Sequence, residues 1–475
     1  MPRHVAIIGG GIAGLAAAFR LLESANKDGM PIACTLIEAG TRWGGKIETH
    51  RVGSLIIEAG PDSFLSHKPS GVALCEQLGL GDQLVNTRDT RDKAFVFSRG
   101  RLRALPEGLV VVVPTKLGPF MRSGLISPPG MARMALDFVL PRRRDAADES
   151  LRSFFQRRLG REACERLIEP LLAGIYAGDA GQLSVQATFP RFQEIEREHG
   201  SLLRGLLASS AKSSGPRPGA RTPFVTLRDG LGTLVDRLVE RIKGHGGTFL
   251  SGRRVEWLRV RSGQPAVWTY DVMLEDGSAV SADAVILAAP AYAAAELIRP
   301  LSPVASELLA GIPYVSTATV SLAYRASDAG PGVAGYGFIV PAVERKTIVA
   351  ATWSSLKWPN RAPADVLLCR CYLGGAGAGE ALATSDRALL GRVRDDLRSI
   401  AGITAEPTFA EINRWDRAMP QYTVGHLDRI GQIETALHRY PGLHLVGAAY
   451  RGVGIPACIK SGTDAADRVL ANIRG

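Results

Sequence analysis

The residues with the clearest chemical potential lie near the start of the chain, in a glycine-rich segment. Residues 9–14 read Gly-Gly-Gly-Ile-Ala-Gly and match the spacing G-x-G-x-x-G. In this pattern the first glycine permits a tight turn, the second lets the backbone approach a pyrophosphate, and the third lets a helix pack against a strand. The helix N-terminus adds N–H donors and partial positive charge to the phosphates. We therefore predict that this turn binds a dinucleotide.

A carboxylate fits the second half of such a site. Glu38 closes a predicted strand and lies 24 residues after Gly14, where it would accept hydrogen bonds from ribose hydroxyls. The glycine segment itself lies between a predicted strand at 4–8 and a predicted helix at 15–22. A plain glycine turn with a surface glutamate is the alternative, and the strand–turn–helix context favours the dinucleotide site.

The rest of the sequence gives little sign of other site chemistry. None of the six cysteines forms a C-x-x-C pair, and none of the eight histidines shows H-E-x-x-H or H-x-x-E-H spacing. Such patterns would indicate a thiol redox motif or a zinc site. No Ser-His-Asp constellation is evident. We therefore predict no metal site and no titratable catalytic residue, with buried thiols in a reducing compartment.

The residues after Glu38 indicate which dinucleotide binds. Residues 39–46 read Ala-Gly-Thr-Arg-Trp-Gly-Gly-Lys, so an R-x-G-G element follows the glutamate. This element resembles that of the amine oxidase/phytoene desaturase flavoprotein superfamily, in which the arginine and the glycines contact the diphosphate and the flavin edge. An NAD-binding domain does not need this element. The resemblance therefore implies FAD.

Further segments resemble the same superfamily in chain order. Residues 58–61 (Glu-Ala-Gly-Pro) resemble the strand under the isoalloxazine ring, and residues 446–447 resemble the segment that closes over the pyrophosphate. Residues 454–455 resemble the turn beside the flavin ring. The resemblance implies these FAD contacts: Gly9, Gly10, Gly11, Ile12, Ala13, Gly14, Glu38, Ala39, Arg42, Gly44, Gly45, Lys46, Gly60, Pro61, Val255, Gly447, Gly454 and Ile455.

A narrower resemblance covers essentially the whole chain. The following segments look like those of the oxygen-dependent porphyrinogen oxidases: 58–64, 169–184, 188–190 with Glu196 and 200–201, 337–341, 353–355 with 359–363, Trp415 with 420–422, and 447–455. That family carries non-covalent FAD and oxidises protoporphyrinogen IX or coproporphyrinogen III to the porphyrin in haem synthesis. The resemblance implies repeated hydride transfer from the porphyrinogen to the flavin, with O2 reduced to hydrogen peroxide. Other enzymes of the haem pathway are expected partners.

Three other interpretations stay open. Another FAD-dependent amine oxidase would share the flavin elements, although the surroundings of Cys458 do not resemble a covalent flavin site. A carotenoid desaturase would fit the first strand–turn–helix unit but not the Tyr-Ala-Gly-Asp segment at 176–179. A flavoprotein that only binds tetrapyrrole would carry the same motifs. Peroxide production with a porphyrinogen would separate it from an oxidase.

The resemblance implies four substrate-binding residues. Gly178 resembles the family glycine whose carbonyl faces the pyrrole N–H groups, and a helix C-cap is its alternative role. Ile339 falls where the family has an aliphatic residue against one pyrrole, and Thr352 where plant members have a second one. Tyr372 falls where those members have a stacking phenylalanine. Membership of the core is the alternative for these three side chains.

One departure from the family pattern bears on the choice of porphyrinogen. Protoporphyrinogen-specific members often have an arginine at the position of Ala94. Its absence removes a bidentate partner for a propionate and resembles the Gram-positive type, which acts on the tetracarboxylate coproporphyrinogen III. Arg91, Lys93 or other basic residues are open substitutes. We slightly favour coproporphyrinogen III.

The elements that must position these residues come from both ends of the chain. A second strand–turn–helix pattern occupies 443–473, and buried-strand patterns occur at 248–250 and 284–288. We therefore predict an α/β fold: a discontinuous Rossmann-like FAD-binding domain with a β-rich substrate domain and an inserted helical domain. The expected ranges are 1–75, 223–295 and 408–475 for the FAD-binding domain, 76–208 for the helical domain, 296–407 for the substrate domain and 209–222 for a flexible loop.

Composition limits the partners. Lysine and arginine exceed aspartate and glutamate by 57 − 46 = 11, and no nucleic-acid motif accompanies the excess. We expect no nucleic-acid partner. An acidic ligand or an anionic membrane surface would use the charge, and a solvated basic face is the default.

The membrane prediction concerns one stretch. No run reaches the roughly 18 apolar residues of a membrane span, and the first residues lack a signal-peptide pattern. We expect a cytoplasmic protein. Residues 102–140 are apolar but broken by prolines, and three arginines follow at 142–144. This combination predicts at most a peripheral contact with the inner face of the membrane, and internal packing of the helical domain is the alternative.

Overall fold

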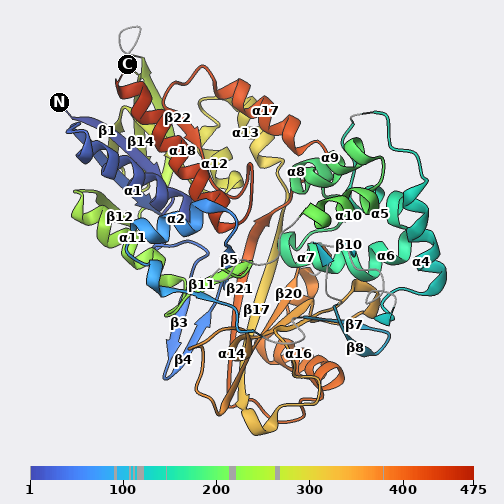
Figure 1. Ribbon diagram of the computed structural model, residues 1–475. Coiled ribbons are helices and arrows are strands. Elements are labelled where there is room, and N and C mark those ends of the chain that lie inside the picture. The colour runs from blue at the N-terminus through green and yellow to red at the C-terminus, as the bar shows by residue number, and fades with distance from the viewer. Residues whose placement is uncertain are drawn as a thin grey trace.

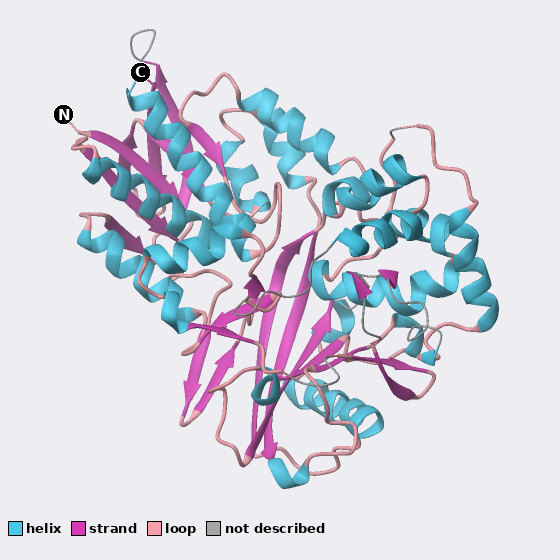
Figure 2. Cartoon of the chain, in the orientation of Figure 1, coloured by secondary structure: helices cyan, strands magenta, loops and turns pink. Residues whose placement is uncertain are grey.

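The chain folds into three packed regions, which Figure 1 shows together: a nucleotide-binding region at the upper left, a large sheet below, and helices at the right. Figure 2 shows that helices dominate the right-hand region and strands the lower one. The computed structural model describes residues 2–89, 94–105, 109–110, 113–114, 122–145, 147–212, 221–262, 268–377 and 379–474.

A five-stranded parallel sheet forms the centre of the nucleotide-binding region. Its order is β12-β2-β1-β16-β22, and all four strand pairs are parallel. The strands are β1 (Arg3–Ile8), β2 (Ile32–Glu38), β12 (Thr248–Ser251), β16 (Ala284–Leu287) and β22 (Leu443–Leu445). They come from the beginning, middle and end of the chain, so the expected discontinuous fold is confirmed. Their apolar character follows from burial on both faces.

Two layers cover this sheet. Three helices, α1 (Ile12–Lys27), α11 (Gly232–Gly244) and α18 (Ile455–Arg474), pack on one face in a single hydrophobic cluster. The other face contacts a three-stranded antiparallel sheet and three further helices. These elements are β13 (Val255–Ser262), β14 (Trp268–Leu274), β15 (Ala279–Ala282), α12 (Ala291–Ile298), α13 (Pro303–Ala310) and α17 (His426–Leu437).

The large sheet has seven strands in the order β21-β17-β20-β19-β18-β7-β8. The strands are β21 (Phe409–Pro420), β17 (Tyr314–Arg325), β20 (Val366–Gly374), β19 (Ala350–Trp353), β18 (Gly337–Ile339), β7 (Phe95–Ser98) and β8 (Arg101–Ala104). Helix α16 (Asp386–Ala401) packs on one face. Three strands lie outside the expected range of 296–407: β7 and β8 belong to the range assigned to the helical domain, and β21 to the range assigned to FAD binding. Pairing over such sequence separations leaves no local pattern, which explains the difference.

Smaller sheets join these regions. A hairpin of β3 (Thr49–Val52) and β4 (Leu55–Glu58) leads into the segment expected under the flavin. A three-stranded sheet has the order β5-β11-β6. The remaining elements of this part are β5 (Phe64–Leu65), α2 (Pro69–Gln77), β6 (Leu84–Asn86), β11 (Phe224–Leu227), α14 (Ser354–Lys357) and α15 (Gly379–Leu382).

The helical region has its own core, which includes Phe154, Phe155 and Leu167. Its elements are β9 (Leu109–Val110), β10 (Val113–Pro114), α4 (Pro128–Ala135), α5 (Leu151–Leu159), α6 (Arg161–Ala163), the π-helix η3 (Cys164–Ile168), α7 (Glu169–Tyr176), α8 (Val185–Thr188), α9 (Pro190–His199) and α10 (Leu202–Lys212). Helix α10 continues through the first four residues of the expected loop at 209–222, so the expected start of that loop is wrong. Residues 213–220 lie outside the described residues.

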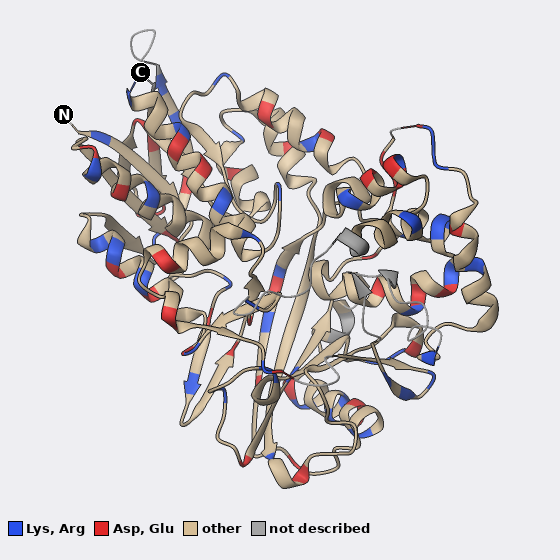
Figure 3. Ribbon diagram, viewed as in Figure 1, with Lys and Arg blue, Asp and Glu red and all other residues tan. Residues whose placement is uncertain are grey.

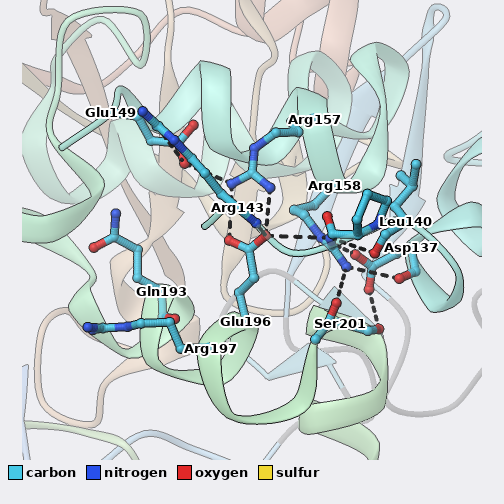
Figure 4. Close-up of polar contacts among 12 residues, drawn as sticks. Asp137, Leu140, Arg143, Glu149, Arg157, Arg158, Gln193, Glu196, Arg197 and Ser201 are labelled. Atoms are coloured by element: carbon cyan, nitrogen blue, oxygen red, sulfur yellow. Dashed lines mark hydrogen bonds and ion pairs between the residues drawn. The ribbon is translucent and has the colours of Figure 1, made fainter. Parts of the chain in front are cut away.

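A buried ion pair ties this region together. Arg158 and Asp137 are fully buried, and Arg158 Nε lies 2.5 Å from Asp137 Oδ1. Figure 4 shows the surrounding contacts, in which Asp137 Oδ2 accepts a hydrogen bond from Ser201. The same oxygen also accepts from the backbone N–H of Leu203. Arg158 also donates to the carbonyl of Gly200 at 2.8 Å. The pair therefore fastens the segment before the arginine run to α5 and α10.

Charges are distributed widely. In Figure 3, lysine and arginine alternate with aspartate and glutamate in all three regions. Within the described ranges, no helix combines the length and hydropathy that a membrane crossing requires.

Candidate cofactor and substrate site

The glycine turn joins β1 to α1 and has the geometry that its spacing predicts. Gly9 has a φ of +110°, and its N–H donates to the carbonyl of Ile37 at 2.8 Å. A Cβ on Gly14 would lie 2.0 Å from Gly9 O, so the helix can start this close to the strand only without a side chain. Apart from its neighbours in the chain, a Cβ on Gly11 would meet no atom of the described residues within 4 Å. Gly11 therefore faces open space, where Ile12 and Ala13 begin the helix.

Glu38 lies at the end of β2 beside this turn. Its Oε2 accepts a hydrogen bond from Gly10 N and its Oε1 accepts one from Gly40 N, both at 2.7 Å. Ala39 lies between Glu38 and Gly40 in the chain. Both hydrogen bonds hold the carboxylate at the mouth of the turn. Glu38, the predicted ribose-binding residue, is thus held in place by backbone N–H groups of the glycine turn and of the following loop, which would also face the cofactor.

The R-x-G-G segment packs directly against the glycine turn. Gly44 N donates to Gly10 O at 2.8 Å, and a Cβ on Gly45 would lie 3.1 Å from Gly11 Cα. Arg42 binds backbone carbonyls of its own loop, Ile47 O at 2.9 Å and Gly45 O at 2.5 Å, and pairs with Glu48. In this structure Arg42 shapes the loop, whereas the resemblance implies contact with the diphosphate.

Lys46 connects this loop to the large sheet. Its Nζ donates to Ala418 O near the end of β21. Desolvation by the surrounding protein lowers the pKa of this ammonium group, although the side chain keeps contact with solvent. The carbonyl of Lys46 would lie 1.7 Å from a Cβ on Gly60, so the segment 59–61 that follows β4 passes against it without room for a side chain.

The C-terminal residues implied in FAD binding lie at the start of α1 and α18. Gly447 has a φ of +113°, and its N–H donates to Ser461 Oγ at 3.2 Å. Gly454 precedes Ile455, the first residue of α18, and α18 packs closely on α1. Val255 is the exception in position: it begins β13 and is buried in the cluster on the opposite face of the sheet.

The arrangement fits a dinucleotide cofactor. The carboxyl ends of two parallel strands meet the N-terminus of a 16-residue helix, and Gly11 leaves backbone open to a ligand. This is the geometry in which phosphates bind to backbone N–H groups and the positive end of a helix dipole. Among the described residues, no group of three or more His, Cys, Asp or Glu is arranged to hold a metal ion.

Three of the four predicted substrate residues share one face of the large sheet. Across the sheet, Ile339 pairs with Ala350, and Ala350 with Tyr372. Thr352 lies two residues from Ala350, so both point to the same side. Its Oγ1 lies 3.5 Å from the hydroxyl of Tyr372. Ile339 packs against the core of the helical region, which therefore faces this side of the sheet.

Gly178 follows the end of α7 and reaches the same junction. The left-handed residue that caps α7 is Ala177, with a φ of +50°, so Gly178 is not the C-cap. A Cβ on Gly178 would lie 2.1 Å from Gln421 Oε1. Ala376 N, just after β20, donates to Ala177 O at 3.0 Å. The segment around Gly178 therefore lies beside the end of the strand that carries Tyr372.

Several contacts that complete the site were not predicted as functional. The carbonyl of Ala59 accepts hydrogen bonds from Thr319, Arg370 and Trp415, each on a different strand of the large sheet. Tyr422 donates to Ala448 O at 2.7 Å and accepts from Gly452 N at 2.7 Å, which fixes the C-terminal loop. Trp415 and Tyr422 occur in segments of the family resemblance, but sequence alone does not show which backbone groups they bind.

Comparison with known proteins decides the family. The family described as "Flavin containing amine oxidoreductase" matches residues 12–470. The chain belongs to this family. It is an oxidoreductase with an α/β fold, and its cofactor is FAD, as the glycine turn and the R-x-G-G segment indicated.

Relatives align over nearly the full length. Coproporphyrinogen III oxidase of Bacillus subtilis (strain 168) is 40% identical, with 98% of each chain covered. Protoporphyrinogen oxidase of Bos taurus is 30% identical, with 99% of each chain covered. The crystal structure of a putative protoporphyrinogen oxidase from Exiguobacterium sp. 255-15 superposes with a TM-score of 0.86 at 32% identity, with 100% of both chains covered.

Proposed function

We propose that this protein is an FAD-dependent porphyrinogen oxidase of haem biosynthesis that uses O2 as electron acceptor and releases hydrogen peroxide. The observation that carries the proposal is the full-length similarity to coproporphyrinogen III oxidases, at 40% identity over 98% of each chain for the Bacillus subtilis relative. The sheet face with Ile339, Thr352 and Tyr372 supports it, because it combines apolar and aromatic groups suited to a flat macrocycle.

FAD, when bound, accepts the hydride that leaves the porphyrinogen in each two-electron step. The protein's own contribution is position. The sheet face and Gly178 orient the macrocycle. The loop held by Tyr422 closes the cofactor side of the site. The helical region covers the sheet face and limits the access of water to the substrate. We propose that FAD is held non-covalently by the contacts described above, because Cys458 is buried against the backbone of 452–453.

We propose coproporphyrinogen III as the preferred substrate. Ala94 lies directly before β7, and its carbonyl accepts from Leu105 N at 2.9 Å. In β7, Val96 pairs with Ile339, so the position of Ala94 lies along the edge of the proposed substrate face. An alanine at this position offers no charged partner to a propionate, whereas protoporphyrinogen-specific members often have an arginine there. Arg91 and Lys93 lie outside the described residues.

The deciding experiment incubates purified holoenzyme with each porphyrinogen in air and follows porphyrin fluorescence and peroxide. We expect kcat/KM for coproporphyrinogen III to equal or exceed that for protoporphyrinogen IX. The substitution Ala94→Arg should shift the ratio toward protoporphyrinogen IX by up to about tenfold, the effect of roughly 1.4 kcal/mol from a partly exposed ion pair. Efficient turnover of protoporphyrinogen IX alone would reject the preference, and no turnover of either would reject the function.

We also propose a peripheral contact with anionic membranes. Val139 is 76% exposed and Leu136 is 48% exposed, and both precede the exposed Arg142 and Arg144. An apolar patch beside basic side chains suits adsorption to anionic lipid. Sedimentation with phosphatidylglycerol vesicles should show binding at low salt that Val139→Asp weakens. Val304→Asp, at a 61% exposed site on α13, is the matched control and should bind as the wild type. No binding at low salt would reject the contact.

A further inference from the structure

Arg370 lies between two predicted parts of the site. One is the flavin strand, residues 58–61, which we expect under the isoalloxazine ring. The other is the substrate face, the side of the large sheet that carries Ile339, Thr352 and Tyr372. Arg370 is 3% exposed and belongs to β20, two residues before Tyr372 and therefore on the same side of the sheet. Its Nη2 donates to the carbonyls of both Ala59 and Gly60, with 3.2 Å to Ala59 O. One guanidinium thus binds two consecutive peptide groups of the segment expected under the isoalloxazine ring.

The same guanidinium also contacts Tyr372. Arg370 Cζ lies 4.8 Å from the centre of the tyrosine ring, and Nη1 lies 3.5 Å from the hydroxyl oxygen. The ring contact is a cation–π interaction, which gains strength away from water. The distance to the hydroxyl is at the long limit of a hydrogen bond. The guanidinium therefore fixes the position of the Tyr372 ring mainly by stacking on it.

The charge of Arg370 is compensated behind the flavin strand. Burial opposes ionisation of Asp62, yet Lys357 and Arg370 hold the pKa of this carboxyl well below its usual range. A small cavity with room for about one water molecule lies here, lined by Glu58, Asp62, Arg361 and Arg370 among others. Within the described part of the chain, Nε of Arg361 and Nε of Arg370 have no hydrogen-bond partner. Nε of Arg370 therefore forms no hydrogen bond with the described residues, and its two terminal nitrogens bind the carbonyls of Ala59 and Gly60 and contact Tyr372.

We infer that Arg370 is a positioning residue that fixes the backbone of 59–60 and the ring of Tyr372 relative to one another. Its effect on turnover rests on the proposed function, whereas its effect on the bound flavin does not. A lysine at this site would keep the charge near Asp62. It would lack the planar fork that binds two carbonyls and stacks on the ring.

The test compares Arg370→Met and Arg370→Lys holoenzymes with Arg361→Met. Arg361 is the matched control, because it is 1% exposed and lines the same cavity but donates to Arg228 O, Leu227 O and Thr226. The readouts are the absorption spectrum and reduction potential of bound FAD, the melting temperature, and kcat and KM separately. All three variants should melt at lower temperature than the wild type.

Only the Arg370 variants should change the flavin. We expect an altered flavin spectrum in both, a more negative reduction potential in Arg370→Met because a nearby positive charge is lost, and a fall in kcat of about 10- to 100-fold from misplacement. Arg370→Lys should recover part of the melting temperature that Arg370→Met loses, but it should not recover kcat. Tyr372→Phe, which keeps the ring, should retain most of kcat.

Three results would overturn the inference. The first is an Arg370→Lys enzyme with wild-type spectrum, potential and kcat, which decides the matter even where Arg370→Met does not fold. The second is an equal change of flavin spectrum in Arg361→Met. The third is a Tyr372→Phe enzyme as impaired as Arg370→Lys. A wild-type enzyme inactive with porphyrinogens would reject the proposed function instead, and the spectrum and potential would still decide the role of Arg370.

Discussion

At the scale of single residues, Gly11 and Gly14 lack side chains for different reasons. A Cβ on Gly14 would lie 2.0 Å from Gly9 O, inside the protein, whereas a Cβ on Gly11 would lie more than 4 Å from every described residue other than its chain neighbours. The constraint on Gly14 is therefore a packing constraint between helix and strand. The constraint on Gly11 arises from the phosphates that we expect to bind there.

The two glycines should consequently fail in different ways. Gly11→Val should fold with a melting temperature close to that of wild-type apoprotein but purify without flavin. Gly14→Val should lose flavin and also melt at lower temperature, because backbone must move to admit the side chain. Flavin absorbance per protein and melting curves of the apoproteins measure both. A yellow Gly11→Val protein with normal flavin content would show that the cofactor lies elsewhere.

At the residue scale, sequence indicates which groups lie together only where those groups are close in the chain. The glycine turn and Glu38 are encoded within 30 residues and occupy adjacent positions in the structure. The carbonyl of Ala59, by contrast, is bound by Thr319, Arg370 and Trp415, which are distant in sequence and belong to three strands. No periodicity or motif reports which backbone group a distant side chain binds, so these roles required the structure.

At the scale of elements, the buried pair of Arg158 and Asp137 should determine the stability of the helical region. Both side chains are fully buried, and Arg158 also donates to Gly200 O. Arg158→Ala would leave a buried carboxylate without its partner, which costs about 3–5 kcal/mol. Urea unfolding followed by circular dichroism should show this loss.

An exposed ion pair in the same region provides the control. Arg161 pairs with Glu165 across one helical turn, and the Arg161 side chain is 81% exposed. Arg161→Ala should cost much less stability than Arg158→Ala, because solvent screens an exposed ion pair. Equal losses in the two variants would contradict the structural role of the buried pair.

A second contact between elements joins the segment after the R-x-G-G motif to the large sheet through His50 in β3. Its Nδ1 lies 2.8 Å from Glu411 Oε1 on β21, and its Nε2 lies 3.1 Å from Glu48 Oε1. Glu48 also pairs with Arg42, and Asn413 donates to Glu411. Desolvation would lower the pKa of His50, but the hydrogen bonds and charges of Glu48 and Glu411 outweigh it and raise the pKa.

The raised pKa predicts a pH window. The stabilisation from protonated His50 is complete below about pH 6.5, the ordinary pKa of histidine, and declines as the pH rises through the higher pKa of the folded protein. The melting-temperature difference between wild type and His50→Gln should therefore shrink as the pH is raised. His438→Gln, at an exposed site after α17, is the control. A pH-independent difference for His50→Gln would contradict the contact.

Elements were predicted well when their own residues carry the pattern. The strands expected at 4–8, 248–250 and 284–288 occur in the structure within about one residue of the expected limits. Membership in a sheet was harder, because β7 joins β18 across more than half of the chain. Register between distant strands depends on tertiary packing, which a single sequence does not display.

At the scale of the whole molecule, the net charge of +11 should influence how fast an anionic substrate arrives. The positive and negative side chains are interspersed in all regions, so the excess acts as a broad field rather than as one binding patch. Such a field raises association rates for anions, and dissolved salt screens it over about 10 Å at 0.1 M ionic strength. A substrate with four carboxylates experiences this attraction more strongly than one with two.

We therefore predict that kcat/KM falls more steeply with ionic strength for coproporphyrinogen III than for protoporphyrinogen IX. The measurement is kcat/KM for both substrates over a series of sodium chloride concentrations, with kcat determined separately. The kcat values should depend little on salt, because screening acts on encounter rather than on the bound complex. Ala94→Arg adds one local cation, so it should shift the substrate ratio at every salt concentration while leaving the two slopes distinct. Equal slopes for the two substrates would show that the charge excess does not guide the substrate to its site.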